Sequence, residues 1–209
     1  MIFVGRKEEI GTVLKALERG ENIVITGKFG IGRTSLIRYI SYTEQNRRRF
    51  IFTDFSKTAK SICSAILTEL YPAQADAKDL SFGALKHKLA NFNATGFRKL
   101  VLVMDNIAKL TSQKLMLIRH LSMQKQFRFI AITEQFLEKS ELDRLRGRLL
   151  PVISIKLSYL TKNESIELAR RFYQLCKMDI SRIDMDSFVT PFHGYPLAIQ
   201  QHFQSKLLL

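Results

Sequence analysis

Short apolar runs alternate with longer amphipathic segments along the first three quarters of the 209-residue chain. The apolar runs are rich in β-branched residues, which is typical of strands buried inside a parallel sheet. They predict five strands, at 22–26, 50–55, 100–105, 127–133 and 152–157. The segments between them carry apolar residues at helical spacing and predict helices at 7–19, 34–42, 57–70, 82–92, 111–122 and 135–148.

The pattern changes after residue 158, where strand-like runs no longer occur. Thr161 and Glu164 form a capping-box sequence that predicts the start of a helix, and shorter helical segments follow at 184–190 and 196–207. Strands that alternate with helices build a parallel sheet covered by helices. We therefore expect an α/β fold: a parallel five-stranded sheet flanked by helices at 1–158, then a small helical lid at 159–209.

The chain is strongly basic, with 33 Lys and Arg against 19 Asp and Glu and a formal net charge of +14. Such a charge attracts polyanions such as nucleic acid, although it also suits an acidic protein partner or simply solubility. Arg47, Arg48 and Arg49 form a compact basic cluster. They are candidate contacts to nucleic-acid phosphates, with a solvated surface as the alternative.

Cysteine content and hydropathy indicate the cellular compartment in which the protein works. Cys63 and Cys176 lie far apart and belong to no CxxC motif, so we expect reduced thiols. No signal peptide and no apolar run long enough for a membrane span are recognisable. These features predict a cytoplasmic protein without a membrane partner.

A glycine-rich turn between the strand at 22–26 and the helix at 34–42 carries the candidate chemistry. It follows the pattern Gly-x4-Gly-Lys-[Ser/Thr], in which backbone N–H groups and the helix N-terminus hold phosphates and the hydroxyl holds Mg²⁺. We expect ATP and magnesium here, against the alternative of a turn without a ligand. The candidate cofactor-binding residues of this turn are Gly27, Lys28, Phe29, Gly30, Ile31, Gly32, Arg33, Thr34 and Ser35.

Two positions near this turn depart from the pattern of a hydrolysing enzyme. Arg33 stands where the pattern has Lys, and its planar fork is bulkier and directs its donors differently. Asp105 ends a buried strand and is a candidate magnesium ligand together with Thr34, although such an Asp can also cap a turn. Asn106 follows where hydrolysing proteins carry Glu, and an amide cannot take a proton. We therefore expect phosphate binding with weak or absent hydrolysis.

Together these motifs resemble the AAA+ and STAND group of P-loop ATPases, especially the branch near the origin-recognition and archaeal-type ATPases. The segment Phe3–Glu9 is similar to the opening box of that group, which implies that Val4, Gly5 and Arg6 line the adenine pocket. Thr133 is similar to the polar residue that senses the outer phosphate, which implies a catalytic role beside Arg33, Asp105 and Asn106. The segment His193–Ala198 is similar to the lid motif, which implies that Pro196 borders the base.

The resemblance also implies an oligomer in which one subunit inserts an arginine into its neighbour's site. Arg144 and Arg148 are the candidate arginine fingers, with a solvated helix face as the alternative. Our leading hypothesis is an ATP-binding nucleotide switch in a DNA-associated process. The alternatives are an active DNA-stimulated ATPase of a remodelling, transposition or replication complex, and a nucleotide-free pseudo-ATPase that serves as a protein-interaction scaffold.

Overall fold

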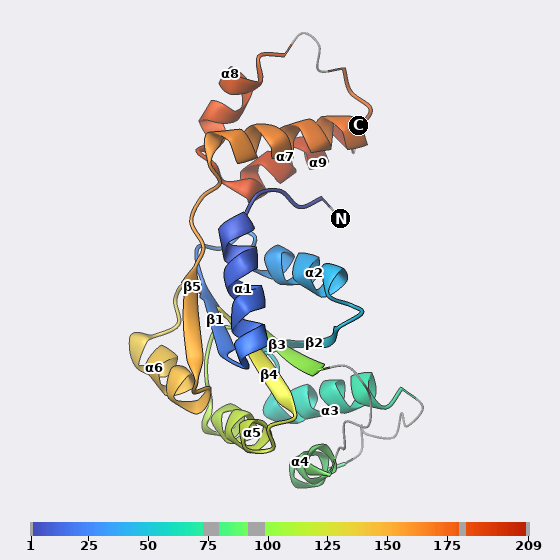
Figure 1. Cartoon of the computed structure of the whole chain (residues 1–209), viewed down its shortest axis with the longest axis vertical. Coiled ribbons are helices and arrows are strands. Elements are labelled where there is room, and N and C mark those ends of the chain that lie inside the picture. The colour runs from blue at the N-terminus through green and yellow to red at the C-terminus, as the bar shows by residue number, and fades with distance from the viewer. Residues whose placement is uncertain (1, 73–79, 92–98, 180–182, 208–209) are drawn as a thin grey trace.

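One parallel sheet forms the centre of the molecule (Figure 1). The computed structural model describes residues 2–72, 80–91, 99–179 and 183–207. The strands stand side by side in the order β2-β3-β4-β1-β5, and each neighbouring pair is parallel. Their bounds are β1 Asn22–Thr26, β2 Arg48–Asp54, β3 Lys99–Ile107, β4 Phe127–Thr133 and β5 Val152–Lys156.

Helices connect these strands and then continue beyond the sheet. The connecting helices are α1 Lys7–Arg19, α2 Arg33–Thr43, α3 Ala59–Leu70, α4 Phe82–Ala90, α5 Ser112–Met123 and α6 Lys139–Arg148. The C-terminal helices are α7 Lys162–Leu175, α8 Met185–Val189, the 3-10 helix Thr190–Phe192 and α9 Pro196–Leu207. No helix within the described segments is both long and apolar enough to cross a membrane.

The two faces of the sheet bury different apolar clusters, because successive side chains of a strand point in opposite directions. In β1, Ile23 and Ile25 pack with α1 and α2, whereas Val24 belongs to the cluster that includes side chains of α3 to α6. Figure 1 shows the corresponding layers, with α1 and α2 on one side of the sheet and α3, α5 and α6 on the other. The sheet is therefore covered on both faces.

The C-terminal helices have an apolar cluster of their own. Leu168, Tyr173 and Phe203 are buried in it, and Val4 from the N-terminal segment joins them. Figure 1 shows this group of helices beyond one end of the sheet, beside the N-terminal segment. The predicted capping box of Thr161 and Glu164 is confirmed at the start of α7.

The structure confirms the predicted fold class and corrects several element bounds. The helix predicted from residue 135 begins at Lys139, because the Glu134 carbonyl first accepts a hydrogen bond from the N–H of Leu137 and forms a turn. Strand β2 begins at Arg48 because this residue already pairs with Lys99 in the sheet. The last residue of the helix predicted at 82–92 lies outside the described residues.

Candidate nucleotide site

The glycine-rich turn leaves the carboxyl end of β1 and leads directly into α2. Gly27, Gly30 and Gly32 have φ angles of 152°, 70° and 96°, which residues with a side chain rarely adopt. Gly32 is the N-cap of α2, and no side chain caps the first turn of this helix. The N–H groups of that turn are therefore suited to an anion. In sheets of this kind ligands bind beyond the carboxyl ends of the strands, where this turn lies.

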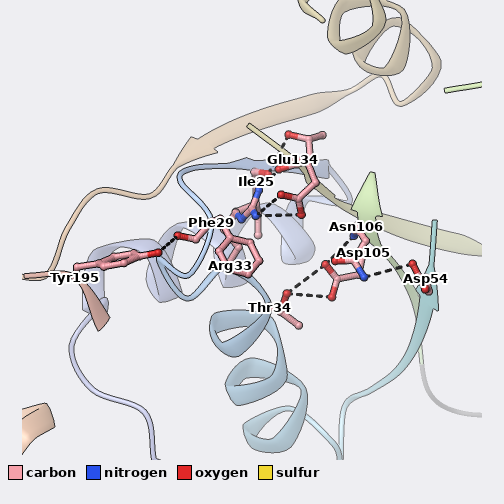
Figure 2. A network of polar contacts seen from close by, with 10 residues as sticks. Ile25, Phe29, Arg33, Thr34, Asp54, Asp105, Asn106, Glu134 and Tyr195 are labelled. Carbon is pink, nitrogen blue, oxygen red and sulfur yellow. Dashed lines mark hydrogen bonds and ion pairs between the residues drawn. The ribbon is translucent and has the colours of Figure 1, made fainter. Parts of the chain in front are cut away.

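Thr34 connects the turn to the end of β3. Its hydroxyl donates to both carboxylate oxygens of Asp105, at 3.0 and 3.2 Å (Figure 2). A hydroxyl and a carboxylate at hydrogen-bond distance supply the hard oxygen donors that Mg²⁺ requires, so the two residues fit this ion. When bound to a nucleotide, magnesium neutralises the charge that develops on the phosphate oxygens.

Arg33 lies against the end of β4. Its side chain is 6% exposed, and its guanidinium donates to the carboxylate of Glu134 at 2.9 and 3.1 Å. It also donates to the Thr133 carbonyl, while the Thr133 hydroxyl donates to the Ile25 carbonyl at 3.5 Å (Figure 2). In this arrangement the charge in the lysine position of the loop is neutralised by Glu134, a residue that the sequence analysis missed.

A second carboxylate lies beside Asp105. Asp54 ends β2 and is the register partner of Asp105 in the neighbouring strand. Asn106 has a φ of 57°; its N–H donates to Asp105 at 2.9 Å and its side-chain amide donates to Asp54 at 3.3 Å. Hydrogen bonds from Ser56 are the largest cause that lowers the pKa of Asp54, and the amide of Asn106 adds to them. Asp54 is therefore held ionised, and the sequence analysis did not single it out.

A narrow cavity of about 80 Å³ lies between the turn, the N-terminal segment and the C-terminal helices. Most of the residues that the sequence resemblance places beside the nucleotide base line this cavity. Its lining includes Val4, Arg6, Ile31, Gly32, Ser35 and Pro196. Ligand pockets usually measure roughly 300 Å³ or more. This cavity is therefore smaller than one that encloses a whole nucleoside, and a larger one of about 690 Å³ adjoins it along Phe3, Val4 and Arg6.

Arg6 ties the opening segment to three other parts of the molecule. Its buried guanidinium donates to the carbonyls of Ile31 at 3.3 Å and Ser158 at 2.6 Å. Its backbone N–H donates to the carboxylate of Glu164 at 3.0 Å. A Cβ at Gly5 would lie 2.1 Å from that carboxylate, so only glycine allows this approach. Arg6 thus contacts the loop, the exit from β5 and the first turn of α7.

The glycine-rich turn also contacts the C-terminal helices directly. The hydroxyl of Tyr195 donates to the Phe29 carbonyl at 2.8 Å (Figure 2). Lys28 donates to the hydroxyl of Tyr159 at 2.7 Å, on the segment that enters α7. A Cβ at Gly30 would lie 2.6 Å from the Tyr195 hydroxyl. The conformation of the turn is therefore linked to the position of the C-terminal helices.

The candidate basic residues divide into exposed and buried groups. Arg144 and Arg148 are exposed on α6, and Arg47 is exposed before β2. Arg48 is buried and paired with Glu44, which is the correction to the predicted surface cluster. Arg49 is half-buried and donates to the Glu69 carbonyl. Of the three clustered arginines, Arg47 therefore has the most freedom to contact a polyanion.

Three features define a P-loop nucleoside triphosphatase fold: the strand order of the parallel sheet, the glycine-rich turn after β1, and Asp105 near the end of β3. A family model described as AAA ATPase domain matches residues 2–132. The chain therefore belongs to the AAA ATPase family.

Solved structures share this fold at low sequence identity. The Orc1 protein of Aeropyrum pernix in complex with DNA has a TM-score of 0.65 and 15% identity, over 95% of this chain and 58% of that one. A RuvB variant of Thermotoga maritima has a TM-score of 0.65 and 20% identity, over 97% and 62%. The initiator DnaA bound to AMPPCP and single-stranded DNA has 0.60 and 12%, over 97% and 61%. The chain thus spans about three fifths of these proteins. No curated protein matches the sequence.

Proposed function

We propose that this domain binds ATP with magnesium and acts as a nucleotide switch, with weak or absent hydrolysis, in a DNA-associated process. The observation that carries the proposal is the hydrogen bond of 3.0 Å between Thr34 and Asp105, because it joins the two halves of a metal–nucleotide site. In this proposal the residues 27–35 hold the phosphates, and Val4 to Arg6 with Pro196 border the base.

The ion pair of Arg33 and the amide of Asn106 support weak hydrolysis. An ATP phosphate that recruits Arg33 must compete with the carboxylate of Glu134, which already receives two hydrogen bonds from the guanidinium. Asn106 occupies the position after Asp105 and cannot accept a proton from water. Binding needs only the backbone of the loop and the metal ligands, whereas turnover also needs a free cation at position 33 and a proton acceptor beside the attacking water. Binding is therefore the better-supported half of the reaction.

The switch itself would be the position of a lid formed by residues 159–209. Tyr195 and Tyr159 contact the loop residues Phe29 and Lys28, so a ligand that rearranges the loop changes what the lid can contact. The cavity of about 80 Å³ supports the same proposal, because it is lined by residues of the lid as well as of the loop. A ligand shifts such an equilibrium by its difference in affinity for the open and closed states.

Charge supports the association with DNA. The formal net charge is +14, and Arg47, Arg144 and Arg148 are exposed. Neutralising phosphates with such side chains makes binding depend steeply on salt. Arg144 or Arg148 could instead enter the site of a neighbouring subunit, as an arginine finger does.

Titration of a fluorescent ATP analogue with magnesium tests the proposal. We expect binding below millimolar concentrations by the wild type, and binding weakened at least tenfold in Thr34→Ala. The matched control is Thr12→Ala, since Thr12 is exposed on α1 and its hydroxyl bonds only to the Glu8 carbonyl. Absence of wild-type binding would refute the proposal and leave the nucleotide-free scaffold.

Phosphate release with and without DNA tests the switch against an active ATPase. We expect slow release that DNA leaves unchanged. Strong stimulation by DNA would overturn the switch in favour of the ATPase. A gel-shift series at rising salt tests the nucleic-acid partner, and salt-insensitive or absent binding would remove DNA from the proposal.

A further inference from the structure

The described residues include two carboxylates near Asp105 that the nucleotide-site motifs do not assign, Asp54 and Glu134. Glu134 receives two hydrogen bonds from the Arg33 guanidinium, one on each carboxylate oxygen. Its carboxylate is therefore already engaged in an ion pair. Asp54 differs, because the hydrogen bonds from the Ser56 N–H and from the Asn106 amide end on the same oxygen, Oδ1. The Ser56 side chain also donates to this carboxylate, so donors from two neighbouring residues orient it.

Asp54 is also placed by the sheet itself. It is the last residue of β2 and the register partner of Asp105, and the N–H of Phe55 donates to the Asp105 carbonyl at 2.7 Å. Polar contacts run without interruption from Thr34 through Asp105 and Asn106 to Asp54 (Figure 2). Asp54 thus lies on the same edge of the sheet as the two metal-binding candidates and is half-buried.

We propose that Asp54, oriented by the Asn106 amide, supplies the carboxylate that accepts the hydrogen bond of the attacking water in residual ATP hydrolysis. The inference rests on the proposed function, since it requires ATP in the loop. In a hydrolysing enzyme of this pattern, the acidic residue follows Asp105 on β3. In this chain that position holds the amide of Asn106, and the acidic residue is Asp54 on the neighbouring strand β2. Asn106 is then a positioning residue, because it acts through Asp54.

The reaction balances without a further reactant. The water oxygen forms a bond to the terminal phosphorus of ATP, and the bond from that phosphorus to the bridging oxygen breaks. The electron pair of that bond leaves with ADP. One proton of the water passes to the Asp54 carboxylate and then to solvent. A positioned base of this kind contributes about 100- to 10,000-fold to a rate.

Single-turnover hydrolysis of radiolabelled ATP, measured beside ATP affinity, tests the inference. We expect Asp54→Asn to slow turnover at least 100-fold while the ATP dissociation constant stays within threefold, so that the variant retains bound ATP for longer. The exchange variant Asp54→Asn with Asn106→Asp restores the acid–amide pair with the acid on β3. The exchange variant should turn over ATP at least tenfold faster than Asp54→Asn.

The control variant is Glu18→Gln, which removes an exposed carboxylate from the last turns of α1 and should leave turnover unchanged. Wild-type turnover in Asp54→Asn overturns the inference, and so does a parallel loss of ATP affinity or an exchange variant without recovery. A wild type that binds ATP but never hydrolyses it also overturns the inference and leaves the proposed switch intact. A wild type that does not bind ATP overturns the proposed function itself.

Discussion

Replacing Arg33 with Lys tests whether its partner is Glu134 or a phosphate. The guanidinium makes two hydrogen bonds to Glu134 and one to the Thr133 carbonyl, and the two side chains are only 6% and 14% exposed. A lysine keeps the charge but has no planar fork, so it loses the bidentate contact. Hydrogen bonds to charged groups contribute about 1.5–3 kcal/mol each, and Lys retains part of this. We expect a loss of about 2 kcal/mol in the free energy of unfolding.

A change of this size in the free energy of unfolding is measurable by thermal unfolding. For a chain of 150–250 residues, 1 kcal/mol shifts the melting temperature by about 2–4 °C, so Arg33→Lys should lower it by about 4–8 °C. Circular dichroism without nucleotide is the assay. The effect should persist at high salt, because buried charges are screened little. ATP affinity should rise by about tenfold in Arg33→Lys, because the lysine ammonium is no longer held by Glu134 and can reach the outer phosphates.

Two comparisons decide the outcome. Arg38→Lys changes an exposed arginine of the same helix and should melt like the wild type. A double-mutant cycle with Glu134→Gln should give a coupling energy of at least about 1 kcal/mol between positions 33 and 134. The reasoning is refuted if Arg33→Lys melts within 1 °C of Arg38→Lys, or if the two substitutions are additive.

Three further outcomes follow from the contacts around the loop. Gly5 has a φ of 69°, and Ala there would press on the Glu164 carboxylate, so Gly5→Ala should lower the free energy of unfolding by about 1–2 kcal/mol in calorimetry. Tyr195→Phe removes the bond to the Phe29 carbonyl and should weaken ATP binding about 2- to 12-fold in a fluorescence titration. Burial acts to raise the pKa of Glu164, but hydrogen bonds from Thr161 and the Arg6 backbone outweigh it and lower the pKa. Glu164 should therefore stabilise the fold above its unfolded pKa of 4.5, and urea unfolding should show this loss as the pH falls below it.

Each of these outcomes has its own control. Gly11→Ala introduces the same methyl into open space on α1 and should not destabilise the protein. Tyr42→Phe changes an exposed tyrosine of α2 and should leave ATP affinity unchanged; equal affinities of Tyr195→Phe and wild type would contradict the lid contact. Glu164→Gln should flatten the pH dependence of stability below pH 4.5, and an unchanged slope would assign that dependence to other carboxylates.

Local pattern sufficed for much of the fold. The strands at 22–26 and 127–133 could be predicted residue by residue, because each is a short apolar run bounded by polar or glycine residues. The contact between Thr34 and Asp105 also follows from their motifs. Contacts across strands could not be predicted in the same way. The position of Asp54 depends on β2 lying beside β3 in register, which no local pattern encodes.

Arg48 and Glu134 illustrate a second limit. Three consecutive arginines suggest a surface, yet residues on a strand alternate between faces, so the middle one turns inward and meets Glu44. The spacing of four between Glu44 and Arg48 was a usable signal for that pair. No such spacing connects Glu134 to Arg33, which is 101 residues away in the chain. Only the parallel pairing of β1 with β4 brings their ends together.

The hydrogen bond from Tyr195 to the Phe29 carbonyl has a consequence for the amide that follows it. A trans peptide is planar, with its carbonyl and its N–H on opposite sides. Because Tyr195 holds the carbonyl of the Phe29–Gly30 peptide, the N–H of Gly30 points away from the lid. One amide donor of the loop thereby loses rotational freedom before any anion arrives. Such preorganisation lowers the entropic cost of binding, so calorimetry of anion binding to Tyr195→Phe should show it as a less favourable entropy.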